Sequence, residues 1–274
     1  MIINKLFFLS VVVLLSVVET PEKNKSELSN TANKEAAKTI RLFNGKNLDG
    51  WYTFIKDRGR GNDPKGVFTV KDGLIHISGE EWGCITTNNE YENYTLTAEF
   101  KWGGKTYEPR INNARDGGIL VHSTGIDGGY SGTWMYGIEC QMIEGGTGDL
   151  LVVGDGSNNF AITSPVAAEK QKSSYLFKEN GAPVTIHAGR INWWGRDDDW
   201  DDVKNFRGKQ DVEKPLGEWN RMECIVDGKN ISIVLNGILV NRAGNVLPSK
   251  GRIQIQSEGA EVLFRRVELK MLQR

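Results

Sequence analysis

The sequence predicts an all-β fold, a jelly-roll type of sandwich in which two antiparallel sheets are stacked. Apolar residues recur with a period of two along most of the chain, hairpin turn dipeptides separate several of these stretches, and hardly any segment carries a helical stripe. With 274 residues, 39% of them hydrophobic, the chain is long enough for one large β domain with a substantial core.

The individual strands follow from strict alternation of apolar and polar residues. The clearest is residues 94–102, which matches a strand with one buried face. Asp-Gly at 72–73 and 227–228, and Asn-Gly at 236–237, lie between such stretches and supply the positive φ angles of tight hairpins. These turns indicate antiparallel pairing. Further alternating stretches are residues 67–71, 74–78, 118–123, 136–143, 184–188, 219–226, 231–235, 252–257 and 262–270.

The N-terminal region is predicted to precede the folded domain. In residues 1–18, Lys5 is followed by a largely apolar run, as in a secretory signal peptide. This run is shorter than the ~20 residues of a spanning helix, so no integral membrane domain is expected, with an uncleaved anchor as the alternative. Residues 19–38 contain no aromatic residue and predict a flexible linker. The domain is then residues 39–274, in a secreted or periplasmic protein.

Charge and cysteine content exclude several classes of protein. Lys and Arg number 34 against 35 for Asp and Glu, so no bulk basic field favours nucleic acid as a partner. Three cysteines cannot form a fully paired framework, and Cys140 and Cys224 occupy apolar positions of strands, which predicts buried free thiols. The three histidines are far apart in sequence, so a structural zinc site is not expected. The oligomeric state is left open.

Two long segments interrupt the alternation, residues 123–132 and residues 187–215. Loops of this length in a compact domain are often functional. The aspartates between residues 197 and 202 suit either a solvated turn or a calcium loop, although the Gly that an EF-hand needs is missing. Flat aromatic faces suit sugar rings, which makes tryptophans in or beside the loops candidate substrate contacts. The candidate substrate contacts of this kind are Trp102, Trp134 and Trp193.

The stretch 137–146 carries the most informative polar pattern. Glu139 and Gln141 share one face of a strand, and Cys140 and Met142 share the apolar face that points to the core. Strict alternation would turn Glu144 away from Glu139, but a one-residue bulge between them would return it to the same face. Two carboxylates and an amide would then be aligned.

This spacing resembles the Glu-x-Asp-x-x-Glu signature of laminarinase-type retaining β-glucanases, which also have a jelly-roll sandwich. In that signature the first Glu is the nucleophile and the last is the acid/base. Gln141 takes the place of the Asp, whose carboxylate helps to set the ionisation of its neighbours. A retaining glycosidase that uses Glu139 and Glu144 is therefore one hypothesis, and Gln141 argues against it.

Two further strands place polar side chains away from the core. Ile119 and Val121 point one way, so His122 points the other. In residues 252–258 the isoleucines point inward, which leaves Glu258 and two glutamines on the opposite face. Such a face is either the solvent side of the sheet or a functional surface, and Glu, Gln and His are less typical of the solvent side than Thr and Lys.

Motifs between Ile40 and Leu272 together resemble one known family, the 3-keto-disaccharide hydrolases. A Glu-x-Gln strand is a recurring feature of that family, and it is present here at residues 139–141. The ordered motifs cover nearly the whole predicted domain. They are residues 42–51, 72–75, 91–94, 116–120, 139–141, 217–220, 235–237 and 264–267.

The resemblance implies a concanavalin A-like jelly roll that acts on glycosides whose C3 hydroxyl has been oxidised to a ketone, by lyase and hydratase steps. Members are commonly secreted bacterial proteins. The chain departs from the family in three places. Asp116-Gly117-Gly118 stands where Asn-Ser-Gly is frequent, His122 replaces an Arg, and residues 193–207 form an insert that bears on substrate identity.

The implied chemistry assigns roles to the candidate residues. A C3 ketone acidifies the C2 proton, so a modest base can remove it, and the enolate then expels the C1 alkoxide. Glu139, His122 and Glu144 are the candidates for the base, the metal ligand and the acid. Gln141 would orient a sugar hydroxyl. Arg115 and Glu258 are further candidate substrate contacts.

A metal-dependent variant and a non-catalytic alternative both stay open. His122 and Glu139 together are a ligand pair that suits a divalent metal ion such as Zn or Mn, which would polarise the ketone. No organic cofactor is expected, and the expected partner is a carbohydrate. A lectin-like module that binds sugar without reaction is the alternative to either enzyme.

Overall fold

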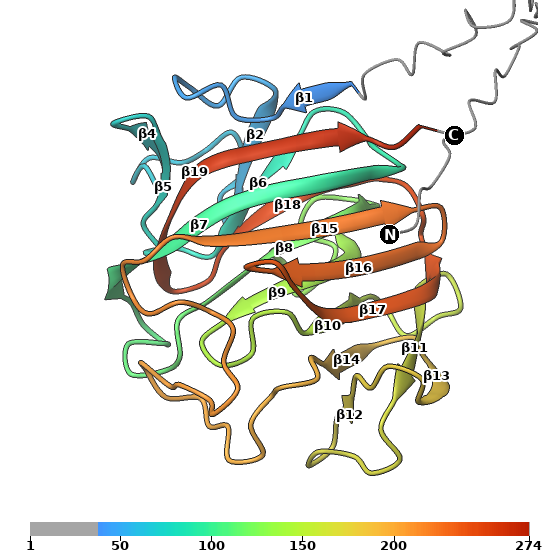
Figure 1. Ribbon diagram of the computed structural model, residues 1–274. Helices are drawn as coiled ribbons and strands as arrows, with labels where there is room; N and C mark the ends of the chain where they lie inside the picture. The colour runs from blue at the N-terminus through green and yellow to red at the C-terminus, as the bar shows by residue number, and fades with distance from the viewer. Residues whose placement is uncertain (1–37, 274) are drawn as a thin grey trace, which may run out of the picture. The chain divides into compact units, whose positions relative to one another are not determined.

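The computed structural model describes residues 38–273, which form two stacked sheets (Figure 1). In Figure 1, β7, β15, β16, β17 and β19 form one layer, and β8, β9 and β10 belong to the other. The predicted signal peptide and residues 19–37 of the predicted linker lie outside the described residues. Residues 38–273 contain no α-helix and hence none that could span a membrane. The predicted concanavalin A-like jelly roll is confirmed.

The first sheet has the strand order β13-β11-β17-β16-β15-β7-β19-β5-β4, with β1 paired to β19. Its longest strands, β7 and β19, lie at the centre and pair antiparallel. Its strands are β1 (Thr39–Arg41), β4 (Phe68–Lys71), β5 (Leu74–Ile77), β7 (Tyr94–Thr106), β11 (Ala161–Val166), β13 (Ala182–Ile186), β15 (Asn220–Asp227), β16 (Asn230–Leu235), β17 (Ile238–Leu247) and β19 (Ala260–Met271).

The second sheet has the order β12-β14-β10-β9-β8-β18-β6-β2-β3. Its pairs are antiparallel except β12 with β14, a short parallel pair at the edge that the prediction of purely antiparallel sheets did not include. Its strands are β2 (Trp51–Ile55), β3 (Gly59–Arg60), β6 (Gly83–Thr87), β8 (Asp116–Thr124), β9 (Tyr136–Ile143), β10 (Leu150–Val153), β12 (Tyr175–Leu176), β14 (Gly189–Asn192) and β18 (Arg252–Ser257).

The three predicted hairpins are present. Residues 72–73 join β4 to β5 and residues 236–237 join β16 to β17, each with two positive φ angles. Between β15 and β16 the turn lies one residue later than the dipeptide, at residues 228–229, because Asp227 still pairs with Asn230. Tight two-residue turns of this kind match the twist of the strands they join.

The core lies between the sheets, because the period of two buries one face of each strand. Cys140 of β9 and Cys224 of β15 are both in this core as free thiols, as predicted. The opposite face of the second sheet carries a smaller apolar cluster around Leu120 and Trp134. Nearly every residue of β8 and β9 is buried, so loops cover this face too. We call it the cleft face.

Candidate active site

Glu139 and Gln141 of β9 lie on the cleft face, because their neighbours Cys140 and Met142 are in the core. They are only 5% and 4% exposed. Glu139 lies opposite Leu120 of β8, and Gln141 lies opposite Gly118 of the same strand. The predicted arrangement of this strand is therefore present, and burial removes both polar groups from bulk water.

Gly118 makes room for the carboxyl of Glu139. An ideal Cβ at Gly118 would lie 2.3 Å from Oε1 of Glu139 and 2.5 Å from Oε1 of Gln256, which comes from β18. Burial raises the pKa of Glu139 to about 8 and the charge of Asp116 adds to the shift, while Arg190 and a hydrogen bond from Gln256 oppose it. Glu139 therefore holds its proton near neutral pH more strongly than an ordinary carboxyl.

Asp116, the first residue of β8, is the second buried carboxyl of the cleft. It accepts hydrogen bonds from Gly117 N at 3.0 Å and Gln141 Nε2 at 3.1 Å. Nη2 of Arg110 lies 3.2 Å from its other oxygen. Burial raises its pKa to about 7 although Arg110 and Arg190 act in the opposite direction. The Asp-Gly-Gly departure from the family pattern thus places a carboxyl beside Gln141.

Glu258 follows β18 directly and completes the group. Burial, and then the negative charges of Asp116 and Glu139, raise the pKa of Glu258 well above its ordinary value. We call Asp116, Glu139 and Glu258 the carboxyl cluster. Glu139 and Glu258 are predicted site residues, and Glu139 lies on the predicted face of its strand.

Arg190 of β14 is the cation that acts on all three members of the carboxyl cluster. It is held by the fully buried Asp149, whose Oδ2 lies 3.3 Å from Arg190 Nη1 and 2.5 Å from Arg196 Nη1. The same carboxylate accepts a hydrogen bond from Trp193 N at 2.8 Å. A guanidinium fixed beside carboxyl groups suits the binding of a developing negative charge.

A cavity of about 310 Å³ opens beside the carboxyl cluster, with Arg110, Asp116, Arg190, Asn192 and Trp200 in its wall. Three buried amide oxygens in this region have no hydrogen-bond partner among the described residues. They are Oε1 of Gln141, Oδ1 of Asn192 and Oε1 of Gln256. Buried acceptors without partners are rare in folded proteins, so these atoms suit a ligand that brings hydroxyl donors.

The long acidic segment closes one wall of this cavity. Asp202 binds Arg110 at 2.8 Å, and it also accepts from Asn113 Nδ2 at 2.7 Å and Ala114 N at 3.1 Å. Among residues 38–273, no group of three or more His, Cys, Asp and Glu side chains could hold a metal ion. Asp198, Asp199 and Asp201 are exposed, as expected for a solvated turn, whereas Asp202 is a structural contact of the 110–114 loop.

His122 lies apart from the carboxyl cluster. A β-bulge between Val121 and Thr124 interrupts the alternation, and His122 has a φ of 56°. Its Nδ1 lies 2.7 Å from the Pro248 carbonyl oxygen, and its ring packs edge-on against the core residue Tyr94. Burial lowers the pKa of His122 to about 4. The structure does not bring His122 and Glu139 together as the predicted metal ligands.

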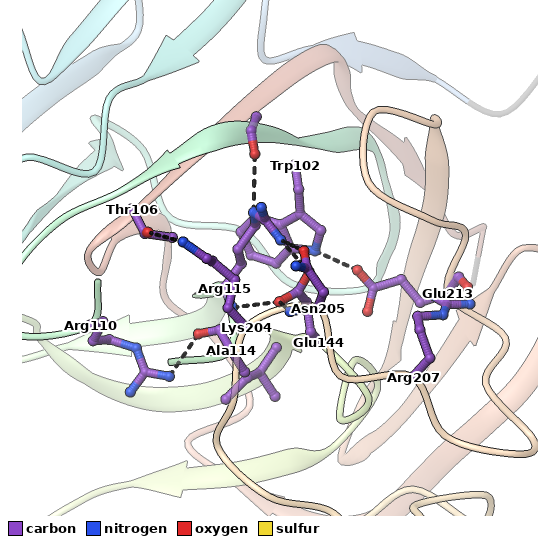
Figure 2. Close-up of polar contacts among 12 residues, drawn as sticks. Trp102, Thr106, Arg110, Ala114, Arg115, Glu144, Lys204, Asn205, Arg207 and Glu213 are labelled. Carbon is purple, nitrogen blue, oxygen red and sulfur yellow. Dashed lines mark hydrogen bonds and ion pairs between the residues drawn. The ribbon is translucent and has the colours of Figure 1, made fainter. Parts of the chain in front are cut away.

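Glu144 and Arg115 are also outside the cleft cluster, because they bind each other. Arg115 Nη1 lies 2.6 Å from Glu144 Oε1, and Arg115 N donates to Glu144 Oε2 at 3.0 Å. Asn205 N donates to the same oxygen at 2.9 Å, and Figure 2 shows these three residues grouped. The predicted pair of Glu139 and Glu144 is therefore not assembled. Glu144 instead ties the insert to Arg115, the residue before β8.

The three tryptophans chosen as sugar contacts are buried. Trp102 and Trp193 belong to the main core, and Trp102 Nε1 donates to Glu213. Trp134 packs into the cluster on the cleft face and stacks on Trp82. Their positions beside loops in the sequence predict exposure, but their side chains pack into the two apolar clusters. Trp200, from the same insert, lines the cavity instead.

The ion pair between Arg115 and Glu144 makes a prediction about stability. Replacing Arg115 with Ala leaves a buried carboxylate without its partner, so we expect a loss of about 3 kcal/mol in the free energy of unfolding, measured by urea denaturation. Arg58→Ala, which breaks an exposed pair with Glu81, is the control and should change stability little. An Arg115→Ala variant of normal stability with a raised KM would instead indicate the predicted substrate contact.

Comparison with protein families gives the identity of the domain. The family described as the 3-keto-alpha-glucoside-1,2-lyase-like domain matches residues 38–270. The chain belongs to this family. It is therefore a carbohydrate-acting, 3-keto-glycoside lyase-like domain, and the resemblance noted in the sequence is confirmed.

Comparison with solved structures finds the following similarities, among others. A putative glycosyl hydrolase from Parabacteroides distasonis ATCC 8503 is 19% identical, with 86% of this chain and 94% of that chain covered and a TM-score of 0.49. The β-glucanase of Bacillus licheniformis is 10% identical, with 88% and 100% covered and a TM-score of 0.44. A comparison with curated proteins found no match.

Proposed function

We propose that the chain is an exported enzyme that cleaves 3-keto-glycosides by elimination across C1 and C2, followed by addition of water. The observation that carries the proposal is the carboxyl cluster, in which Asp116 and Glu139 lie on either side of Gln141 and the charges of Asp116, Glu139 and Arg190 act on Glu258. Proton removal next to a ketone is favoured by a base of raised pKa and by a cation near the enolate oxygen. Export, to the periplasm or out of the cell, rests on the predicted signal peptide.

In the elimination step, the Glu139 carboxylate takes the proton from C2. The electron pair of the broken C2–H bond moves into the C3 carbonyl and forms an enolate. The oxygen of this enolate lies near the Arg190 guanidinium. The enolate electrons then form the C1–C2 double bond as the C1–O bond breaks. Glu258, protonated because its pKa is raised, gives its proton to the departing oxygen.

In the hydration step the same two residues act with exchanged roles, Glu258 as the base and Glu139 as the acid. Glu258, now a carboxylate, takes a proton from water as the water oxygen bonds to C1. Glu139 returns its proton to C2, and the product is a free 3-keto sugar. Asp116 acts as a positioning residue, because its hydrogen bond from Gln141 Nε2 turns the unpartnered Oε1 of Gln141 toward a ligand.

The rate should rise with pH through the titration of Glu139. Only the carboxylate form removes the C2 proton, and its pKa is about 8, so kcat/KM should fall about tenfold per pH unit below that value. At higher pH, loss of the Glu258 proton should lower the rate again. A profile of kcat/KM between pH 5 and 10 measures this. A kcat/KM that is already nearly constant from pH 5 upward, as an ordinary carboxyl pKa of about 4.3 would give, would contradict the assignment.

The proposed reaction is tested with a 3-keto-glucoside and its unoxidised parent, each with and without a chelator. Release of the leaving group from the keto sugar alone supports the elimination, and loss of release on chelation adds a metal requirement. Release from the parent indicates an ordinary glycosidase. Saturable binding without release from either compound indicates a lectin-like module.

A further inference from the structure

A second cavity, of about 370 Å³, has no role in the proposed reaction. Its wall consists of Lys56, Asp57, Glu80, Glu81, Trp82 and Pro109. Pro109 belongs to this wall, and the next residue, Arg110, belongs to the wall of the first cavity. The segment around residues 109–110 therefore borders both cavities.

The strand register places this second cavity beside the carboxyl cluster. Gln256 of β18 pairs with Cys84 of β6, and Ser257 pairs with Gly83. One step further along the two antiparallel chains, Glu258 comes level with Trp82. The carboxyl cluster thus borders the first cavity through Asp116, and its member Glu258 is level in register with Trp82, a wall residue of the second.

Trp82 presents a fixed aromatic surface to the second cavity. Its ring stacks on Trp134 with centroids 5.7 Å apart, and Trp134 stacks on Tyr130 at 6.4 Å. Its buried Nε1 donates to no acceptor among residues 38–273. Lys56 Nζ lies 5.8 Å from the ring centroid, at the outer limit of a cation–π contact, and forms no ion pair within the described chain.

The two cavities differ in chemistry. The first contains arginines, a carboxyl and amide groups, which suit a ketone and the hydroxyls of an oxidised sugar. In the second, Glu81 is paired with Arg58 and Glu80 with Lys65, so the groups left for a ligand are the Trp82 ring, two hydrogen-bond donors and the Asp57 carboxylate. Such a surface binds a ring with little selectivity for the substituents that the ring carries.

We propose that the Trp82 cavity is a subsite for the ring of the leaving group, while the oxidised sugar occupies the Arg190 cavity. This rests on the proposed function, because a leaving group exists only if a glycoside is cleaved. The Glu258 carboxyl, level with Trp82, is then placed to protonate the departing oxygen as that ring occupies its subsite.

The test compares methyl and phenyl 3-keto-glucosides, in both anomers, on the full mature chain. Trp82→Ala should lose about tenfold in kcat/KM on the phenyl compound and less than twofold on the methyl compound. Trp82→Phe should retain most activity on both. Trp194→Ala, at an exposed tryptophan that lines neither cavity, is the matched control and should change neither value.

Equal losses on both substrates, or none on either, would overturn the subsite. A separate binding measurement distinguishes its failure from failure of the reaction. Fluorescence titration of the Glu139→Gln variant should show the phenyl compound binding about tenfold more tightly than the methyl compound, and adding Trp82→Ala should remove the difference. If the native protein releases no leaving group but this contrast is present, the subsite stands and the reaction fails. If the two affinities are equal, the subsite is wrong.

Discussion

Glu139→Gln is expected to lower kcat on a 3-keto-glucoside by roughly 10²- to 10⁴-fold, the usual contribution of a general base. The amide keeps the shape of the side chain and its contact with Gln256, so KM should change little. Loss of kcat at constant KM is typical of a group that acts in the reaction and not in substrate binding. Steady-state kinetics on the purified variant measure both constants.

Glu213→Gln is the matched control for this variant. Glu213 is 2% exposed and burial raises its pKa to about 8, as for Glu139, but it accepts hydrogen bonds from Trp102 and Thr147 outside the cleft. Its replacement should leave kcat nearly unchanged. Equal losses in both variants would show that removing any buried carboxyl disturbs the protein, and would contradict a specific role for Glu139.

Gly118→Ala is expected to reduce kcat by about 10²-fold, because a small misplacement of a catalytic group has an effect of this size. The added methyl would meet Glu139 Oε1 at 2.3 Å and Gln256 Oε1 at 2.5 Å, so both side chains must move. The φ of Gly118 is not positive, so the backbone itself accepts Ala. Kinetics and thermal unfolding of the same preparation separate a displaced base from an unfolded domain.

Gly117→Ala tests the same strand without the clash. The nearest atoms to a Cβ at Gly117 are 3.8 Å away, an ordinary van der Waals contact with Trp102, so activity should be retained. A fully active Gly118→Ala variant would mean that Glu139 need not occupy its place above Gly118. The assignment of the base would then be wrong.

Local alternation was sufficient to predict the sandwich and part of the site. Side chains two apart on a strand share a face, which placed Glu139 and Gln141 correctly and put Glu258 on the polar side of the last strand of the second sheet. The hairpin dipeptides predicted the pairing of neighbouring strands. These features depend on residues close together in the sequence.

The remaining site residues depend on contacts that alternation does not encode. A bulge after Val121 turned His122 to the core, where sequence spacing alone predicted the opposite face. Glu144 forms an ion pair with Arg115, which is 29 residues away in the sequence, and this pair gives Glu144 a structural role. Arg190 and Arg110 gave no signal in sequence, since an arginine on a strand or loop usually faces solvent. In the sequence, the only feature that marks Asp116 is its departure from the Asn-Ser-Gly pattern that is frequent in the family.

The most direct test of the central claim uses a 3-keto-glucoside that carries deuterium at C2 and compares its rate of leaving-group release with that of the unlabelled compound under kcat/KM conditions. Removal of the C2 label by Glu139 predicts a primary isotope effect on kcat/KM, and this readout does not depend on whether Glu139 returns the same deuteron to C2 in the hydration step. The Glu139→Gln variant should release almost no leaving group from either compound. Equal kcat/KM values for the two compounds with the native enzyme would contradict elimination and indicate direct hydrolysis at C1.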